Sequence, residues 1–105
     1  MLHLPLPKGS GADEYFEALN EKALPFLLDD PPDVLLICAG YDALDQDPLA
    51  SVKLAPSDFG ASVEAILAAF PRERVALGLE GGYLLDAERG MPAAVVATCE
   101  ALVAR

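Results

Sequence analysis

The chain has 105 residues, of which 53% are apolar, and a formal net charge of −10. This length permits at most one small domain, and the apolar content excludes a disordered or tail-like chain. The acidic charge argues against direct nucleic-acid binding, which relies on Lys and Arg, and is compatible with cationic partners such as lysine-rich tails or polyamines.

Neither the N-terminus nor the apolar runs carry a targeting or membrane signal. Residues 1–5 have no basic start and no long apolar region, and three aspartates within residues 29–33 interrupt the most hydrophobic stretch. We therefore expect an intracellular, cytoplasmic protein with no membrane partner. Cys38 and Cys99 lack the spacing of a metal site, which predicts two buried, reduced thiols.

The first predicted element is a helix over residues 13–28, after an irregular segment rich in proline and glycine. One apolar stripe of helical period runs along it: Tyr15, Leu19 and Ala23. Ser10, with Asp13 three positions later, resembles a capping box. Two prolines at positions 31 and 32 end the helix, because a proline disfavours helical geometry in the residue before it.

Two short apolar runs, residues 33–38 and 74–79, are predicted strands. Between them, residues 41–55 lack a clean period and form a loop, whereas residues 56–70 have the apolar face of a helix. Because a crossover helix joins the two strands, we expect them to be adjacent and parallel.

After the second strand, the sequence predicts a tight glycine turn over residues 80–83 and a final helix over residues 84–104. The order αβαβα indicates the α/β class. Two parallel strands leave both sheet edges unpaired, so we expect the chain to be part of a larger sheet and to self-associate through its edges. Apolar surface is expected to stay partly uncovered at Val34, Leu36 and Val75.

Polar side chains follow each predicted strand. The run Cys38-Ala39-Gly40-Tyr41-Asp42 follows the first, and Leu79-Glu80-Gly81-Gly82-Tyr83 follows the second. Ligands bind beyond the carboxyl ends of parallel strands, so Asp42 and Tyr83 are expected to face one crevice. A carboxylate there can hold a metal, and a phenol can donate a hydrogen bond. Each residue also has an ordinary structural interpretation, since an Asp often caps a turn and a Tyr often packs over one.

These runs, together with Asp47-Pro48-Leu49, closely resemble stretches of the zinc-dependent histone deacetylase and acetylpolyamine amidohydrolase family. The resemblance runs through essentially the whole chain but matches only the C-terminal part of a complete catalytic domain. It identifies residues 1–105 as the C-terminal portion of a histone deacetylase-like catalytic domain. It implies the arginase/deacetylase fold, a three-layer αβα architecture with a parallel sheet.

The resemblance also implies roles for individual residues. Asp42 corresponds to the last of three zinc ligands, and Tyr83 to the catalytic tyrosine that donates to the substrate carbonyl oxygen. Gly81 and Gly82 would bind substrate by letting the backbone come close to it. Asp47 is interpreted as structural, bonding loop amides. The implied substrates are acetylated lysine side chains or acetylpolyamines.

The same family uses a pair of adjacent histidines as base and acid, and an Asp-x-His pair as the other metal ligands. His3 is the single histidine of this chain and has neither pattern around it. We therefore expect the 105-residue chain alone to be inactive and to bind zinc weakly or not at all. The alternative is a non-catalytic interaction module derived from a truncated deacetylase. A nucleotide-binding half-domain is disfavoured, because no glycine-rich phosphate loop follows either strand.

Overall fold

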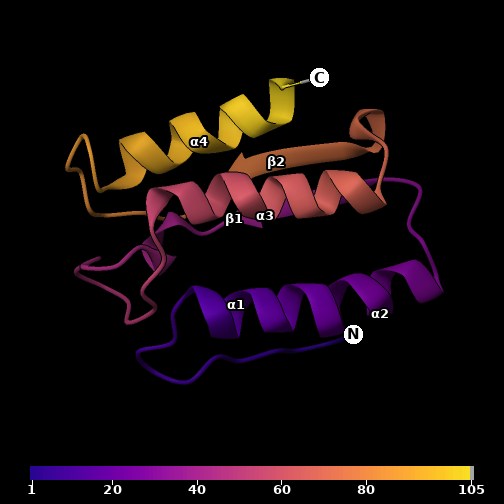
Figure 1. The fold of residues 1–105 in the computed structure, drawn as a ribbon, viewed down its shortest axis with the longest axis horizontal. Helices are drawn as coiled ribbons and strands as arrows, with labels where there is room; N and C mark the ends of the chain where they lie inside the picture. Colours follow the sequence, from indigo (N-terminus) through magenta and orange to yellow (C-terminus); the bar gives the residue numbers. More distant parts are fainter. Residues whose placement is uncertain (105) are drawn as a thin grey trace.

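In the computed structural model, which describes residues 1–104, helices and two strands alternate along the chain (Figure 1). The elements are α1 Ala12–Ala18, η1 Leu19–Ala23, α2 Leu24–Asp29, β1 Leu35–Ala39, η2 Tyr41–Ala43, α3 Pro56–Ala69, η3 Arg72–Arg74, β2 Val75–Leu79 and α4 Met91–Val103. The predicted order αβαβα is confirmed, although both strands begin slightly later than predicted. None of the helices within the described residues is long and apolar enough to cross a bilayer.

The predicted first helix is confirmed, but it is not a uniform α-helix. Its middle turn, η1, is a π-helix that separates α1 from α2. Pro25 is the second residue after this turn and cannot donate the usual backbone hydrogen bond to residue i−4, so a widened turn suits the position.

The helix begins at Ala12, and its cap lies one residue after the predicted one. Gly11 is the capping residue, and its N–H donates to the Glu14 carboxylate at 3.0 Å. Ser10 does not cap the helix, because its hydroxyl donates to the Pro7 carbonyl at 2.7 Å.

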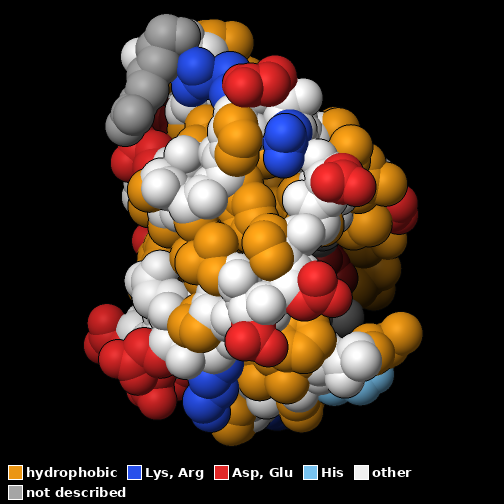
Figure 2. Space-filling view, turned by 90° about the vertical axis from the view of Figure 1, so that its right-hand side faces the viewer, with side chains coloured by type: hydrophobic (Ala, Val, Ile, Leu, Met, Phe, Trp, Pro, Cys, Tyr) orange, Lys and Arg blue, Asp and Glu red, His pale blue; other side chains and the backbone are white. Residues whose placement is uncertain are grey.

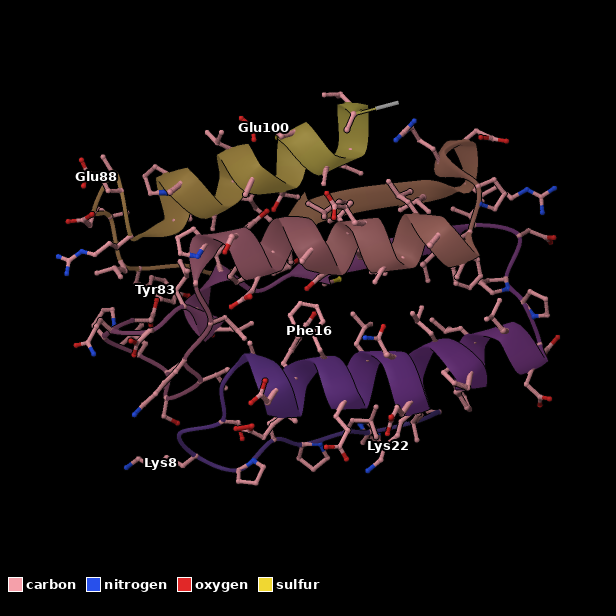
Figure 3. The ribbon with its side chains drawn as sticks, viewed as in Figure 1. Lys8, Phe16, Lys22, Tyr83, Glu88 and Glu100 are labelled. Carbon is pink, nitrogen blue, oxygen red and sulfur yellow. The ribbon has the colours of Figure 1, made fainter. Side chains whose placement is uncertain are left out.

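β1 and β2 pair in parallel, with Leu35 opposite Val75 and Ala39 opposite Leu79. The predicted adjacent parallel pairing is therefore confirmed. Alternate side chains such as Ile37 and Leu77 face the helices, where α3 and α4 pack together over the sheet (Figure 1). The buried core and the side chains packed on it are Ala39, Tyr41, Leu44, Ala94, Phe59, Leu77, Met91 and Val95. From α1, Phe16 points toward α3 (Figure 3).

The opposite face of the sheet is uncovered in the described part of the chain. Val34 and Leu36 are 59% and 72% exposed, which confirms the predicted apolar surface. Apolar side chains also lie exposed at the end of the molecule where the strands begin (Figure 2). The prediction of two buried thiols is wrong, because Cys38 lies on the uncovered face and Cys99 on the exposed side of α4.

The final helix begins at Met91, so the prediction of a helix over residues 84–104 is wrong for its first seven residues. Asp86 instead organises a turn, since its Oδ1 accepts the N–H groups of Glu88 and Arg89, each at 2.9 Å. Gly90 then caps α4, and a proline stands in the first turn, where its missing N–H costs nothing. A side chain at position 90 would collide with the Leu84 carbonyl.

Candidate active site

Two loops, one after each strand, lie at the same edge of the sheet. The N–H of Glu80 donates to the Ala39 carbonyl at 2.9 Å, which extends the ladder one residue beyond β2. Residues 40–42 and 80–83 therefore leave the sheet side by side. Tyr83 lies at this end of the molecule, where the loops gather (Figure 3).

The Asp42 carboxylate and the Tyr83 hydroxyl both lie close to Gly81. A Cβ atom added to Gly81 would stand 3.5 Å from Tyr83 Oη and 3.7 Å from Asp42 Oδ1. Gly81 also has a φ of +78°, a conformation that favours glycine. The two polar groups thus share one small space, as the positions of the strand ends predict.

Asp42 lies in η2 and is partly exposed. Within residues 1–104, no hydrogen bond reaches its carboxylate. A Cβ atom added to Gly40 would stand 2.9 Å from Asp42 Oδ1, so the glycine leaves room for this carboxylate. A carboxylate without a protein donor fits the role of a metal ligand.

The described residues do not supply a complete metal site. Among residues 1–104, no group of three or more His, Cys, Asp or Glu side chains could hold a metal ion. His3 is exposed and lines a pocket with residues of the first helix such as Glu14 and Lys22. Within the described residues, Asp42 therefore has no second or third side chain beside it with which it could hold a metal ion.

Tyr83 is half exposed, and its backbone is fixed by Asp47. Asp47 Oδ2 accepts the Tyr83 N–H at 3.0 Å, and Oδ1 accepts the Leu49 N–H at 2.8 Å. Asp47 itself is only 6% exposed. The prediction that Asp47 bonds loop amides is confirmed, and its bond to Tyr83 joins the two loops of the site.

Gly82 and Tyr41 attach the site to the helices. Gly82 has a φ of +126°, and a Cβ atom on it would stand 2.7 Å from Tyr41 Cβ. Tyr41 is fully buried, and its hydroxyl donates to Thr98 Oγ1 at 2.9 Å. Thr98 in turn donates to the Ala94 carbonyl at 2.8 Å. Local sequence patterns do not reveal the contact between Tyr41 and Thr98, because the two residues are 57 positions apart.

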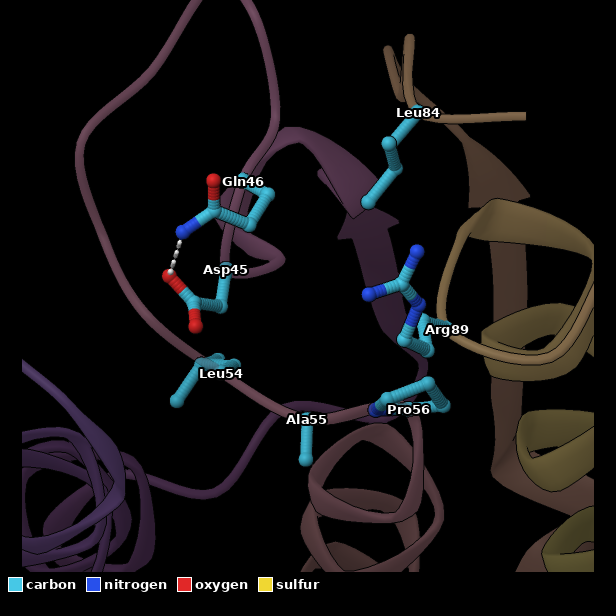
Figure 4. Close-up of a pocket in the computed structure, with 7 residues that line it drawn as sticks. All are labelled: Asp45, Gln46, Leu54, Ala55, Pro56, Leu84 and Arg89. Atoms are coloured by element: carbon cyan, nitrogen blue, oxygen red, sulfur yellow. Dashed lines mark hydrogen bonds between the residues drawn. The ribbon is translucent and has the colours of Figure 1, made fainter. Parts of the chain in front are cut away.

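A pocket of about 400 Å³ borders these loops (Figure 4). Its lining residues are Asp45, Gln46, Leu54, Ala55, Pro56, Leu84 and Arg89. The Gln46 amide donates to Asp45 at 3.3 Å, and both side chains are exposed. Arg89 also contacts Asp86, which lies outside the pocket lining. The backbone N–H groups of Arg89 and Glu88 hold the pKa of the Asp86 carboxyl below its ordinary value, and the Arg89 guanidinium lowers it further.

Comparison with known proteins identifies the family. A family model described as the histone deacetylase domain matches residues 1–99. The chain belongs to the histone deacetylase family. It is 45% identical over 85 residues to the uncharacterized protein slr0245 of Synechocystis, and 38% identical over 88 residues to the chloroplastic histone deacetylase 10 of Oryza sativa. These alignments each cover 81% of this chain.

The fold agrees with this assignment. An acetylpolyamine aminohydrolase from Burkholderia pseudomallei superposes on 96% of this chain with a TM-score of 0.82 and 25% identity. The chain is a small α/β domain with a parallel two-stranded sheet, and its structural neighbours have the arginase/deacetylase fold. The chain spans 27% of the Synechocystis protein, 20% of the rice protein and 28% of the Burkholderia chain.

Proposed function

We propose that this chain supplies the C-terminal part of the active site of a zinc-dependent deacetylase. The observation that carries the proposal is that the Asp42 carboxylate and the Tyr83 hydroxyl both lie within 4 Å of the position that a Gly81 Cβ atom would take. Membership in the histone deacetylase family supports the reaction class.

The reaction is hydrolysis of an amide that joins an acetyl group to an amine. Water adds to the carbonyl carbon, the C–N bond breaks, and acetate and the free amine are released. Zinc, when bound, acts as a Lewis acid on the amide carbonyl. Asp42 would hold the metal together with two ligands from outside these 105 residues. The general base would be a further residue from outside them.

Tyr83 acts on the carbonyl oxygen. Its hydroxyl donates a hydrogen bond that strengthens as this oxygen gains negative charge during attack, which is how such donors lower a reaction barrier. Asp47 orients Tyr83 by holding its backbone N–H. Gly81 keeps a side chain out of the space that the two polar groups share. With Gly82 beside it, a substrate is expected to approach the backbone closely.

The substrate is proposed to be an acetylated lysine side chain or an acetylpolyamine. Both classes occur in the names of relatives, a rice histone deacetylase and a Burkholderia acetylpolyamine aminohydrolase. The net charge of −10 suits substrates that carry positive charge. Comparing turnover of acetyl-lysine peptides with turnover of acetylpolyamines distinguishes the two classes.

The test uses a complete deacetylase domain that contains this 105-residue sequence. Tyr83→Phe is expected to lower turnover by about 10²–10³-fold with its zinc content intact. Asp42→Ala is expected to lose zinc as well as activity. Tyr15→Phe, in the first helix, is the matched control and should leave both unchanged. Normal turnover in both site variants would refute the assigned roles.

The second candidate is a non-catalytic interaction module, which the uncovered apolar face of the sheet favours. Such a module would bind its partner whether or not Asp42 and Tyr83 were intact. A natural partner protein whose complex has no deacetylase activity would support this candidate.

A further inference from the structure

The Tyr41 hydroxyl begins a buried chain of hydrogen bonds that ends on the backbone of α4. Tyr41 is fully buried, and its Oη donates to Thr98 Oγ1 at 2.9 Å. Thr98 is also buried, and it donates to the Ala94 carbonyl at 2.8 Å. Because the Thr98 hydroxyl has a single hydrogen, which it gives to Ala94, it accepts the hydrogen of Tyr41. The phenol is thus fixed at one point of α4.

The ring of Tyr41 is held by two further elements. Its centroid lies 4.8 Å from that of Phe59 in α3, with an angle of 32° between the two planes. Its Cβ atom lies so close to Gly82 that a methyl group added there would stand at 2.7 Å. The side chain therefore touches α3, α4 and the turn after β2. Since it is fully buried, it is not a group that touches a substrate.

Asp42 follows Tyr41 directly in the short turn η2. Within residues 1–104, no hydrogen bond reaches the Asp42 carboxylate, so the described part of the chain holds this side chain only through its backbone. The turn is closed by the Leu44 N–H, which donates to the Tyr41 carbonyl at 3.3 Å. Tyr41 is the residue of η2 whose side chain is buried, and its contacts therefore attach the turn to the helices.

A polar pair is not required to fill this space. Phenylalanine opposite valine has nearly the same shape, and replacing both partners of a buried hydrogen bond by apolar groups of that shape changes stability little. A fully paired polar contact in a core restricts the packing to one arrangement. The bond between Tyr41 and Thr98 therefore serves the position of η2 more than the stability of the fold.

We propose that Tyr41 is a positioning residue for Asp42. Its bond to Thr98 holds η2 against α4 and so places the Asp42 carboxylate where it can bind a zinc ion. This inference rests on the proposed function, which assigns Asp42 to the metal. Residues that orient a metal ligand from behind change the metal affinity by about 10–100-fold when they are removed.

The test uses a complete deacetylase domain that contains this 105-residue sequence, and it measures the zinc dissociation constant by competition with a chelator. Tyr41→Phe and Thr98→Val should each raise this constant about tenfold or more. The double variant should raise it no further than the larger single effect, because both changes remove the same bond. Thr98→Ser keeps the hydroxyl and should bind zinc as the unaltered domain does.

Stability, measured in the metal-free form, should respond differently from zinc affinity. The double variant exchanges a polar pair for an apolar one, so it should unfold near the temperature of the unaltered domain and still bind zinc weakly. Val63→Ala is the matched control, since Val63 is buried in α3 outside the core cluster that contains Tyr41. This variant leaves a cavity, so it should unfold at a lower temperature and still bind zinc normally. A role in folding alone would make affinity follow stability.

Deacetylation gives a second readout. Saturating zinc should restore turnover in Tyr41→Phe, because no group that touches substrate has changed, whereas Tyr83→Phe should stay slow at any zinc concentration. Unchanged zinc affinity in both Tyr41→Phe and Thr98→Val, or an equal loss in Thr98→Ser or Val63→Ala, would overturn this inference alone. A domain that binds no zinc while Tyr41 is intact would refute the proposed function together with it.

Discussion

Asp47 accepts a hydrogen bond from the backbone N–H of Tyr83 at 3.0 Å, although the two residues are 36 positions apart in sequence. The other oxygen of the same carboxylate holds the Leu49 N–H at 2.8 Å. One buried side chain thus fixes the loop after β1 and the loop after β2 together. The position of the Tyr83 hydroxyl relative to Asp42 depends on this connection.

Asp47→Ala is expected to lower the free energy of unfolding by about 2–3 kcal/mol, because two N–H groups lose a charged acceptor. Denaturant unfolding measures this loss. Asp45→Ala is the control, since Asp45 is an exposed carboxylate in the same loop and should change stability by less than about 0.5 kcal/mol. Equal effects from the two substitutions would contradict the assigned role of Asp47.

Gly82→Ala is expected to destabilise the chain by about 2–4 kcal/mol, through backbone strain and overpacking. Its φ is +126°, and the added methyl group would stand 2.7 Å from Tyr41 Cβ. Gly78→Ala adds the same methyl group in open space, and is expected to leave stability unchanged or raise it by up to about 1 kcal/mol. Thermal unfolding of both variants gives the comparison, and similar midpoints would argue against the packing of Gly82 on Tyr41.

Tyr41→Phe is expected to cost about 1–2 kcal/mol, because Thr98 loses a buried hydrogen-bond donor. Thr98→Val removes the same bond from the other side. Since the two residues share one interaction, the double variant should lose less stability than the sum of the single variants. Strictly additive losses in this double-mutant cycle would show that the bond contributes nothing to the attachment of η2 to α4.

The isolated 105-residue chain is expected to be inactive, to bind zinc weakly or not at all, and to self-associate. Asp42 would supply only one ligand, and the uncovered face of the sheet exposes Val34 and Leu36 beside the unpaired strand edges. Light scattering, zinc titration and a deacetylation assay measure the three properties. A monomer at high concentration that deacetylates a peptide in a chelator-sensitive reaction would contradict this expectation.

The turn before α4 is expected to weaken in acid. The pKa of Asp86 is lowered in the folded state, chiefly by the backbone N–H of Arg89. A lowered carboxyl pKa stabilises the fold above the ordinary pKa of Asp, and this contribution disappears as the pH falls through the folded value. Asp86→Asn should therefore unfold at a lower temperature than the unaltered chain at neutral pH, and the difference should shrink toward about pH 2. A difference independent of pH would show that the charge of Asp86 does not matter.

Local patterns predicted the strands and the central helix, because each was an uninterrupted apolar run or a clear helical stripe. They failed at the start of α4, where Leu84 and Leu85 fitted a helical period. The helix begins instead at the capping glycine at 90, with the proline at 92 in its first turn. Cys38 was expected to be buried because its strand is apolar on both sides, but only one side is covered here.

The meeting of Asp42 and Tyr83 could be predicted because both follow parallel strands at the same edge of the sheet. The bond between Asp47 and Tyr83 could not be predicted, since it depends on how two loops fold against each other. The same is true of the contact between Tyr41 and Thr98, which requires α4 to cross the end of β1.

The strand register has a consequence for tolerated changes in length. Ala39 is paired with Leu79 at the end of the sheet. The number of residues between this pair and Asp42 or Tyr83 therefore sets how far each side chain lies beyond the sheet. A slip of one residue would move Tyr83 by about 3.3 Å along the strand and turn the side chains of β2 to the opposite face. An insertion at η3 lengthens only a surface connection, whereas deleting one residue between Val75 and Tyr83 takes the phenol out of reach of Asp42.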